Sequence, residues 1–136
     1  HIIGQMRTVP PAVSDNLNSV RLLGMRIDRV TMDDALSLVE RFITERTPHH
    51  IVTADASMVV TYNQDAEFAR IVDASDLVTP DGAGILWASR YKGTPVTAKV
   101  SGVDLAARCC ELSGKKNWRI FFFGAAPGVA EQARAR

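Results

Sequence analysis

The sequence predicts an α/β fold: an open, mostly parallel sheet with helices on both faces, preceded by a short N-terminal hairpin. From about residue 32 onward, short apolar segments alternate with segments whose apolar residues recur at helical spacing. The segment 118–123, Trp-Arg-Ile-Phe-Phe-Phe, is apolar almost throughout, as expected for a strand buried on both faces. This alternation is typical of a Rossmann-like arrangement.

The first expected elements are a hairpin and an amphipathic helix. Apolar residues alternate over 20–30 and the pattern is broken by Gly24, which favours a short hairpin or a bulged strand. Thr31 is placed to cap the next helix, and two aspartates fall in its first turn, where the helix dipole favours negative charge. Apolar residues at helical spacing then predict a helix over 32–46.

The remaining elements are expected in alternating order. Strands are expected at 49–53, 76–78 and 118–123. Helices are expected at 56–62, 65–74, 82–91 and 102–113, with a last helix beginning at Pro127. The residue before the helix at 56–62 is Asp55, which can cap it, and residues 94–101 are expected to form an extended loop.

Length and composition indicate one folded domain. The chain has 136 residues, so we expect a flexible lead-in over 1–18 and a single α/β domain over 19–136. It begins with His1 and stops inside a helical pattern, so we expect a piece of a longer protein, incomplete at its C-terminus. The formal net charge of +1 gives no reason to expect a nucleic-acid partner. The sequence contains no apolar run long enough to span a membrane.

Candidate site residues follow the expected strands. In a parallel sheet, ligands bind at the edge where the strands end. Three strand ends would deliver polar or glycine residues to that edge: Thr53 and Asp55, then Thr79, Asp81 and Gly82, then the turn from Gly124 to Gly128. Asp81 stands on a stiff Thr-Pro-Asp-Gly corner, where it is either a functional carboxylate or a simple helix cap.

Several chemical roles are open for these residues. The turn from Gly124 to Gly128 is suited to hold a phosphate through backbone N–H groups, but it matches neither the P-loop nor the GxGxxG pattern, and a plain strand-to-helix turn also explains it. Asp55 and Asp81 are able to share acid and base roles, whereas the absence of an Asp-x-Asp sequence argues against a dedicated metal site. Lys99 is either an anion contact or a solvated surface residue.

The residues from about 20 to the end resemble the WecG/TagA/CpsF glycosyltransferase family. The resemblance is carried by blocks that occur in the family's order and spacing: 31–35, 52–56, 74–84, 100–105 and 123–130. The most specific blocks are Asp-Leu-Val-Thr-Pro-Asp-Gly-Ala-Gly at 76–84 and Ser-Gly-Val-Asp-Leu at 101–105.

The resemblance implies an inverting hexosyltransferase. Such an enzyme moves an N-acetylmannosamine-like or related hexose from a UDP-sugar to a polyprenyl-diphosphate-linked sugar. It works in the cytoplasm, peripherally at the inner face of the bacterial plasma membrane, and its products feed teichoic acid and other surface glycans. The family is regarded as metal-independent, and no cofactor is expected. The membrane surface is an expected partner of the full-length protein, and homo-oligomer formation is left open.

The resemblance also assigns roles to residues of this chain. Asp81 corresponds to the proposed catalytic base, and Thr53 is associated with the active site. Substrate contacts are expected from Thr53, Asp55, Thr79, Gly82, Lys99, Gly124 and Gly128. The family usually has Asn where Asp55 stands and Arg where Lys99 stands, and a second carboxylate beside Asp81 is expected to raise the pKa of one of the two. Two alternatives stay open: a Rossmann-like nucleotide-binding module and a non-catalytic homologue.

Overall fold

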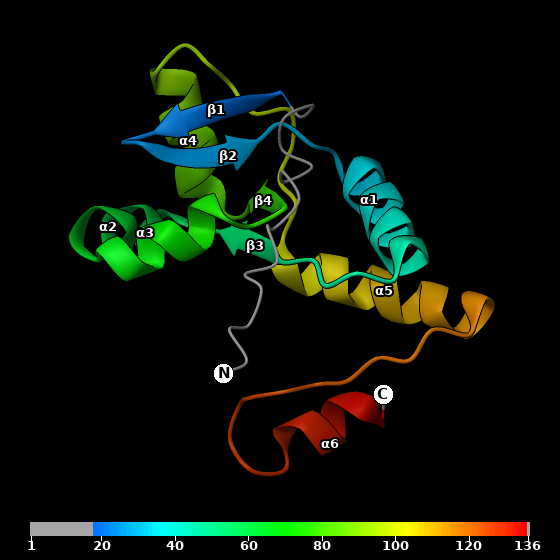
Figure 1. Ribbon diagram of the computed structural model, residues 1–136. Helices are drawn as coiled ribbons and strands as arrows, with labels where there is room; N and C mark the ends of the chain where they lie inside the picture. Colours follow the sequence, from blue (N-terminus) through cyan, green and yellow to red (C-terminus); the bar gives the residue numbers. More distant parts are fainter. Residues whose placement is uncertain (1–17, 136) are drawn as a thin grey trace, which may run out of the picture. The chain divides into compact units, whose positions relative to one another are not determined.

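The computed structural model describes residues 18–135, which form two compact units (Figure 1). The first unit ends at Leu105 and the second begins at Ala106. The expected flexible lead-in over 1–18 lies almost wholly outside the described residues, and the single domain over 19–136 stays a prediction. The first unit contains both strand pairs and the candidate site.

The first unit alternates strands and helices as the sequence predicts. In order, its elements are β1 (Ser19–Leu22), β2 (Met25–Asp28), α1 (Met32–Glu45), β3 (Ile51–Ala54), α2 (Ala56–Gln64), α3 (Ala66–Asp73), β4 (Leu77–Pro80), α4 (Ala83–Tyr91) and the start of α5 (Gly102–Lys116). Residues 94–101 form no helix or strand, which confirms the predicted extended segment.

The N-terminal hairpin is confirmed. Strands β1 and β2 pair antiparallel, with Leu22 opposite Met25, so two residues make the turn. Both turn residues, Leu23 and Gly24, have positive φ (47° and 90°). A two-residue turn of this kind has the twist that joins neighbouring strands well, and glycine adopts it without steric cost.

The parallel arrangement is confirmed for one strand pair. Strands β3 and β4 run parallel, and Thr53 lies opposite Thr79. The amide of Asp81 continues the ladder by donating to the carbonyl of Ala54 at 2.8 Å. Each sheet in the described residues has two strands, so the fold is mixed α/β with a small parallel sheet. A larger open sheet of the Rossmann-like kind stays a prediction.

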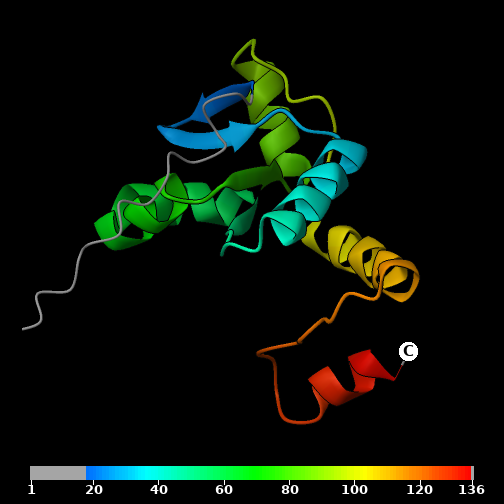
Figure 2. The same ribbon diagram turned by 45° about the vertical axis from the view of Figure 1, so that its right-hand side comes forward.

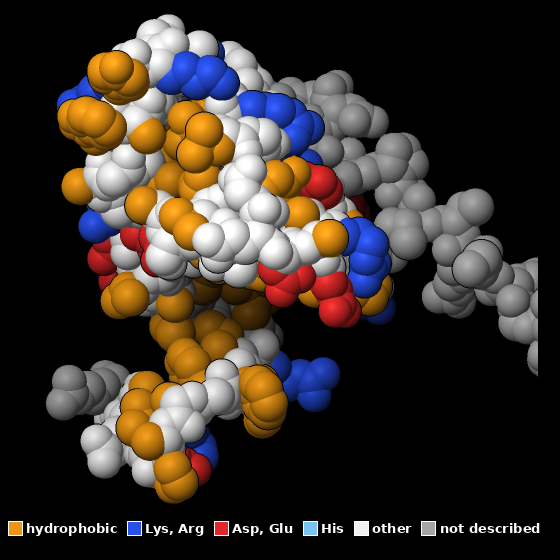
Figure 3. Space-filling view, turned by 90° about the vertical axis from the view of Figure 1, so that its left-hand side faces the viewer, with side chains coloured by type: hydrophobic (Ala, Val, Ile, Leu, Met, Phe, Trp, Pro, Cys, Tyr) orange, Lys and Arg blue, Asp and Glu red, His pale blue; other side chains and the backbone are white. Residues whose placement is uncertain are grey.

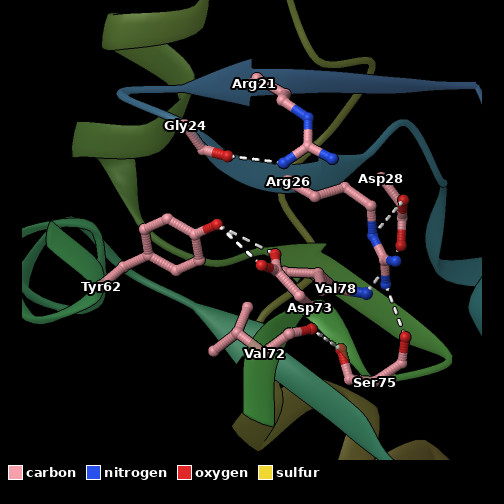
Figure 4. A network of polar contacts seen from close by, with 9 residues as sticks. All are labelled: Arg21, Gly24, Arg26, Asp28, Tyr62, Val72, Asp73, Ser75 and Val78. Atoms are coloured by element: carbon pink, nitrogen blue, oxygen red, sulfur yellow. Dashed lines mark hydrogen bonds and ion pairs between the residues drawn. The ribbon is translucent and has the colours of Figure 1, made fainter. Parts of the chain in front are cut away.

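The edge of β4 that faces away from β3 is covered by other parts of the first unit. The carboxylate of Asp28 accepts a 2.8 Å hydrogen bond from the amide of Val78 (Figure 4). Further along the same strand, the amide of Val100 donates to the carbonyl of Pro80 at 2.8 Å. Proline is suited to such an edge because it has no N–H group to leave unpaired. These bonds hold the hairpin and the 94–101 segment against β4.

Asp28 and Arg26 form a buried charged pair on the hairpin. The Nε atom of Arg26 lies 3.2 Å from Oδ1 of Asp28, and both side chains are buried. The two atoms are not aligned for a hydrogen bond, but Arg26 donates through Nη2 to the carbonyl of Ser75 at 2.8 Å (Figure 4). Burial raises the pKa of Asp28 above its ordinary value of 3.8, and the Val78 amide and the Arg26 charge oppose this rise.

The apolar core lies between the hairpin, the parallel pair and the helices around them (Figure 2). Strand β2 lies beside β4 and α3, and α4 lies beside β1. Residues buried completely or nearly so come from β2, α3, β4 and α4: Met25, Ile27, Val72, Val78 and Ile85. Because β4 is buried along its whole length, the residue that follows it is placed by the core rather than by a free loop.

Helix α1 begins as the sequence predicts. Thr31 is its N-cap: the Thr31 hydroxyl accepts from the amide of Asp34, and the Asp34 carboxylate accepts from the amide of Thr31 at 2.8 Å. This reciprocal pair is a capping box, made here with aspartate. The helix ends at Glu45, where the next residue, Arg46, is in the left-handed region.

The second unit departs from two sequence predictions. Helix α5 runs past Gly114 to Lys116, and the strand expected at 118–123 is wrong because those residues form no strand. A strand needs a neighbour to pair its N–H and C=O groups, and the described part of the second unit contains no other strand. The apolar side chains of Phe121 and Phe123 are exposed instead. The last helix, α6 (Val129–Arg134), begins two residues after Pro127.

Replacing Asp28 tests how the hairpin is held on β4. Asp28→Ala leaves a buried guanidinium and the Val78 amide without their partner, so unfolding free energy in urea should fall by about 3–5 kcal/mol. The exposed Asp33→Ala on α1 is the control, with an expected loss of about 0.3–1 kcal/mol. Equal losses in the two variants would contradict the anchoring role.

The pH dependence gives a second test of the same carboxyl. Because its pKa is raised in the folded state, Asp28 binds its proton more tightly in the folded than in the unfolded chain. Its contribution to stability is therefore fully present below about pH 3.8 and declines as the pH rises through the folded pKa. The unfolding free energy of Asp28→Asn should lack this decline. If the unfolding free energies of the two proteins change with pH in parallel above about pH 3.8, the decline does not come from Asp28.

Candidate functional site

The candidate site is built around Asp81, at the carboxyl end of the β3–β4 pair. Its backbone is fixed by the bond to Ala54, and its side chain is half-buried. Oδ2 of Asp81 accepts a 3.0 Å hydrogen bond from the amide of Gly102, the first residue of α5. One carboxylate oxygen of Asp81 is thus oriented by a backbone amide.

Gly82 lets the chain turn sharply from β4 into α4. It has φ 90° and ψ 157°, a backbone conformation that residues with a side chain rarely adopt. It is also the N-cap of α4, and no side chain of the described residues caps this helix. The first N–H groups of α4 are therefore available beside Asp81, where the positive end of the helix dipole attracts negative charge.

Thr53 lies against the start of α5. A Cβ atom built on Gly102 would come within 2.7 Å of Oγ1 of Thr53, closer than such atoms approach one another. Glycine at position 102 is thus what allows α5 to approach β3 closely. This approach brings Thr53, which lies on β3, and Asp81, which follows β4, to the same helix start.

Asp55 caps helix α2, as the sequence predicts. Its Oδ1 accepts from the hydroxyl of Ser57 at 2.6 Å and from the amide of Met58 at 3.0 Å. The Ser57 bond, followed by the Met58 bond, lowers the pKa of Asp55 below its ordinary value. Asp55 is therefore not the member of the carboxylate pair whose pKa would be raised; it is an exposed, ionised helix cap.

Thr79 is a buried residue that holds a neighbouring segment next to the candidate site. Its side chain is completely buried, and its hydroxyl donates to the carbonyl of Val100 at 3.1 Å. A direct substrate contact from this side chain, as expected from the sequence, is incompatible with that burial. Thr79 instead holds the segment that carries Lys99, whose own side chain is exposed while its neighbour Val100 is anchored on β4.

Gly124 and Gly128 belong to the second unit. Both have positive φ (104° and 87°), and Ala125 between them has φ 64°. Gly128 is the N-cap of the short helix α6. The conformation is that of a tight turn before a helix, and a phosphate contact at this turn stays a prediction.

His49 and His50 lie at the opposite end of β3, and their contacts are structural. The ring of His49 stacks on Phe42 with 4.0 Å between centroids, and it lies 2.9 Å from a carboxylate oxygen of Glu45. The amide of His50 donates to Asp76. The His49 contacts join the end of α1 to the start of β3, and the His50 bond joins the start of β3 to the residue before β4.

The described residues contain neither a metal-binding cluster nor a helix that could span a membrane. Between residues 18 and 135, no group of three or more His, Cys, Asp or Glu side chains is placed to hold a metal ion. Over the same residues, no helix has the length and apolarity required to cross a bilayer.

Two features of the site were not predicted from the sequence. One is the bond from Gly102 to Asp81, which joins residues 21 positions apart. The other is the contact between helices α2 and α4: a Cβ atom on Gly84 would lie 2.9 Å from Cβ of Ala56. Gly102 and Gly84 were the available sequence signal, because a glycine in the first turn of a helix can mark a close approach to a neighbouring element.

The chain belongs to a family of glycosyltransferases. The sequence model of the glycosyl transferase WecG/TagA/CpsF family matches residues 20–136. This confirms the resemblance inferred from the motifs, and the match covers the strand pairs from the second residue of β1 onward and the whole candidate site.

Curated relatives carry one shared name. A protein of Bacillus spizizenii, 29% identical over 86 residues, is named N-acetylglucosaminyldiphosphoundecaprenol N-acetyl-beta-D-mannosaminyltransferase; the match covers 63% of this chain and 34% of the relative. A Staphylococcus aureus protein of the same name is 23% identical over 121 residues, covering 88% of this chain and 48% of the relative. The chain thus spans about a third to a half of the length of these relatives.

The close approach at Gly102 can be tested on one helix. Gly102→Ala places a methyl group against Thr53, so the unfolding free energy should fall by about 1–3 kcal/mol. Gly114→Ala on the same helix meets no described atom within 4 Å and should be neutral or stabilise by up to about 1 kcal/mol. Urea unfolding measures both, and equal behaviour of the two variants would contradict the packing described for Gly102.

Proposed function

We propose that this chain carries the catalytic base of an inverting glycosyltransferase that uses a UDP-sugar. The observation that supports the proposal most strongly is the Asp81 carboxylate at the end of a parallel strand pair, half-buried and oriented by the Gly102 amide. Ligands of open α/β sheets bind at this edge. Membership of a glycosyltransferase family gives the site its reaction class.

The proposed reaction is a direct displacement at the anomeric carbon of the donor sugar. An acceptor hydroxyl attacks that carbon, and Asp81 takes the hydroxyl proton as the new C–O bond forms. The bond between the anomeric carbon and the phosphate oxygen breaks, and UDP leaves with the electron pair. Attack opposite the leaving group inverts the configuration. The bond from Gly102 holds Oδ2, so the proton goes to Oδ1.

The leaving group carries negative charge, and this edge offers groups to balance it. The uncapped N–H groups at the start of α4 are one source, since a helix N-terminus stabilises anions. Lys99 is the second, because its exposed ammonium stands on an anchored segment. Lysine supplies charge without the two-pronged geometry of arginine. A contribution from Gly124 and Gly128 rests on the resemblance alone.

The substrates follow from the names of the relatives. We propose N-acetylmannosamine or a related hexose as the sugar transferred and a polyprenyl-diphosphate-linked N-acetylglucosamine as the acceptor. Thr53 and Asp55 are proposed to contact sugar hydroxyls. With a membrane-bound acceptor, the enzyme acts peripherally at the inner face of the plasma membrane, in the synthesis of a bacterial surface glycan.

Asp81→Asn tests the proposed base. The amide oxygen of Asn can still accept from Gly102, so folding should be retained, while loss of the base should lower kcat by about 10²–10⁴-fold. The assay measures sugar transfer from a UDP-hexose to a lipid-linked acceptor by mass spectrometry.

The matched control is Asp33→Asn on α1, away from the site, with unchanged turnover expected. Undiminished turnover by Asp81→Asn would refute the assignment. A folded parent chain that binds UDP-sugar but transfers none would favour a non-catalytic homologue, and stabilisation by NAD alone would favour the nucleotide-binding module.

A further inference from the structure

An apolar groove of about 660 Å³ lies on the first unit between the hairpin turn, α2 and α4. We define the apolar groove by six lining residues: Leu23, Ala56, Val60, Gly84, Trp87 and Tyr91. Hydrophobic side chains gather on this side of the first unit in the space-filling view (Figure 3). The volume falls within the range of sites that bind small organic molecules.

The walls of the apolar groove expose large hydrophobic side chains to solvent. The exposed fractions are 76% for Leu23, 54% for Val60, 67% for Trp87 and 83% for Tyr91. Beneath them lie the buried side chains of Val59 and Ile85, which belong to the core. A continuous exposed apolar surface of this kind is uncommon on a soluble protein and marks a binding surface.

One end of the apolar groove lies at the helix starts that border the candidate site. Ala56 directly follows Asp55, and Gly84 is the second residue after Gly82. The close contact of Ala56 and Gly84 keeps the first turns of α2 and α4 together. The groove therefore begins in the first turns of the two helices whose caps stand at the carboxyl edge of the sheet.

The other end of the apolar groove has the composition of a membrane interface. Trp87 and Tyr91 stack with 5.4 Å between their ring centroids, and the next residue, Lys92, also lines the groove. The ammonium of Lys92 donates to the carbonyl of Arg21, which ties the end of α4 to the hairpin. Tryptophan and tyrosine concentrate at the membrane–water boundary, and lysine extends its charge to lipid headgroups.

We infer that the apolar groove holds the polyprenyl chain of the lipid-linked acceptor, an inference that rests on the proposed function. The acceptor joins a sugar diphosphate, which must reach Asp81, to a hydrocarbon chain, which must return to the bilayer. An apolar path along α4, about 13 Å long for nine residues, keeps the first isoprene units out of water. The path runs from the site edge to an aromatic and basic rim.

A photoreactive lipid tests this inference. The probe is farnesyl diphosphate with a benzophenone on its terminal isoprene unit, and crosslinked peptides of the full chain are located by mass spectrometry. Crosslinks should fall on the groove segments around Val60 and Trp87. Geranylgeranyl diphosphate should compete with the probe, whereas isopentenyl diphosphate, with the same headgroup and one isoprene unit, should not.

Two exposed apolar residues give a matched pair of variants. Val60→Glu places a charge in the apolar groove and should lower crosslinking about tenfold. Ile71→Glu, on α3 outside the groove, should change it by less than about twofold. Both side chains are exposed in the folded chain, so thermal unfolding of each variant should match the parent.

Three results would overturn the inference: crosslinks confined to other segments or absent, equal labelling of Val60→Glu and the parent, or competition by isopentenyl diphosphate. A dimer that Val60→Glu separates, in a chain that the probe does not label, would assign the groove to a second copy instead. Labelling requires no sugar transfer. Groove crosslinks in a chain without transferase activity would therefore support the groove while counting against the proposed function.

Discussion

The hydrogen bond that the Val78 amide donates to Asp28 joins the hairpin to the strand that ends at the candidate site. A carboxylate with no exposed surface is costly to desolvate, and Arg26 and the Val78 amide offset that cost only in part, since the pKa of Asp28 remains raised. The arrangement therefore specifies how the hairpin packs more than it adds stability. If the hairpin shifted along β4, a buried charge and a strand amide would both lose their partners.

Strand β4 links the packed core to the candidate site. Strand β4 is held along its free edge by Asp28 at Val78 and by the Val100 amide at Pro80, so the Pro-Asp-Gly corner starts from a fixed point. Gly82 then supplies the positive φ, and the Gly102 amide orients the carboxylate of Asp81. A carboxylate positioned in this way loses little freedom when a ligand binds, which suits the catalytic role proposed for Asp81. The apolar groove along α4 is the site proposed for the hydrocarbon part of a lipid-linked acceptor.

Local chemistry accounts for the parts of the fold that the sequence predicted well. The capping by Thr31 and Asp55, the short hairpin and the turn into α4 all depend on neighbours within about four residues. The strand predicted at 118–123 was wrong because apolar composition does not indicate whether a neighbouring strand is present to pair with it. The hydrogen-bond partners of Asp28 and Asp81 could not be predicted from the sequence either, because these bonds join residues 50 and 21 positions apart. Nothing in the sequence around Thr79 indicated that its hydroxyl would be buried and bonded to a backbone carbonyl instead of facing a ligand.

Chemical shifts of backbone amides, followed by NMR while a UDP-sugar is titrated into the labelled chain, test the central claim most directly. The donor is proposed to bind at the carboxyl edge of β3 and β4. Saturable shifts are then expected at Thr53, Gly82 and Gly102, with no such shifts from NAD at the same concentration. Unchanged amides at these three positions in the presence of UDP-N-acetylmannosamine, or a response to NAD alone, would contradict this placement of the donor.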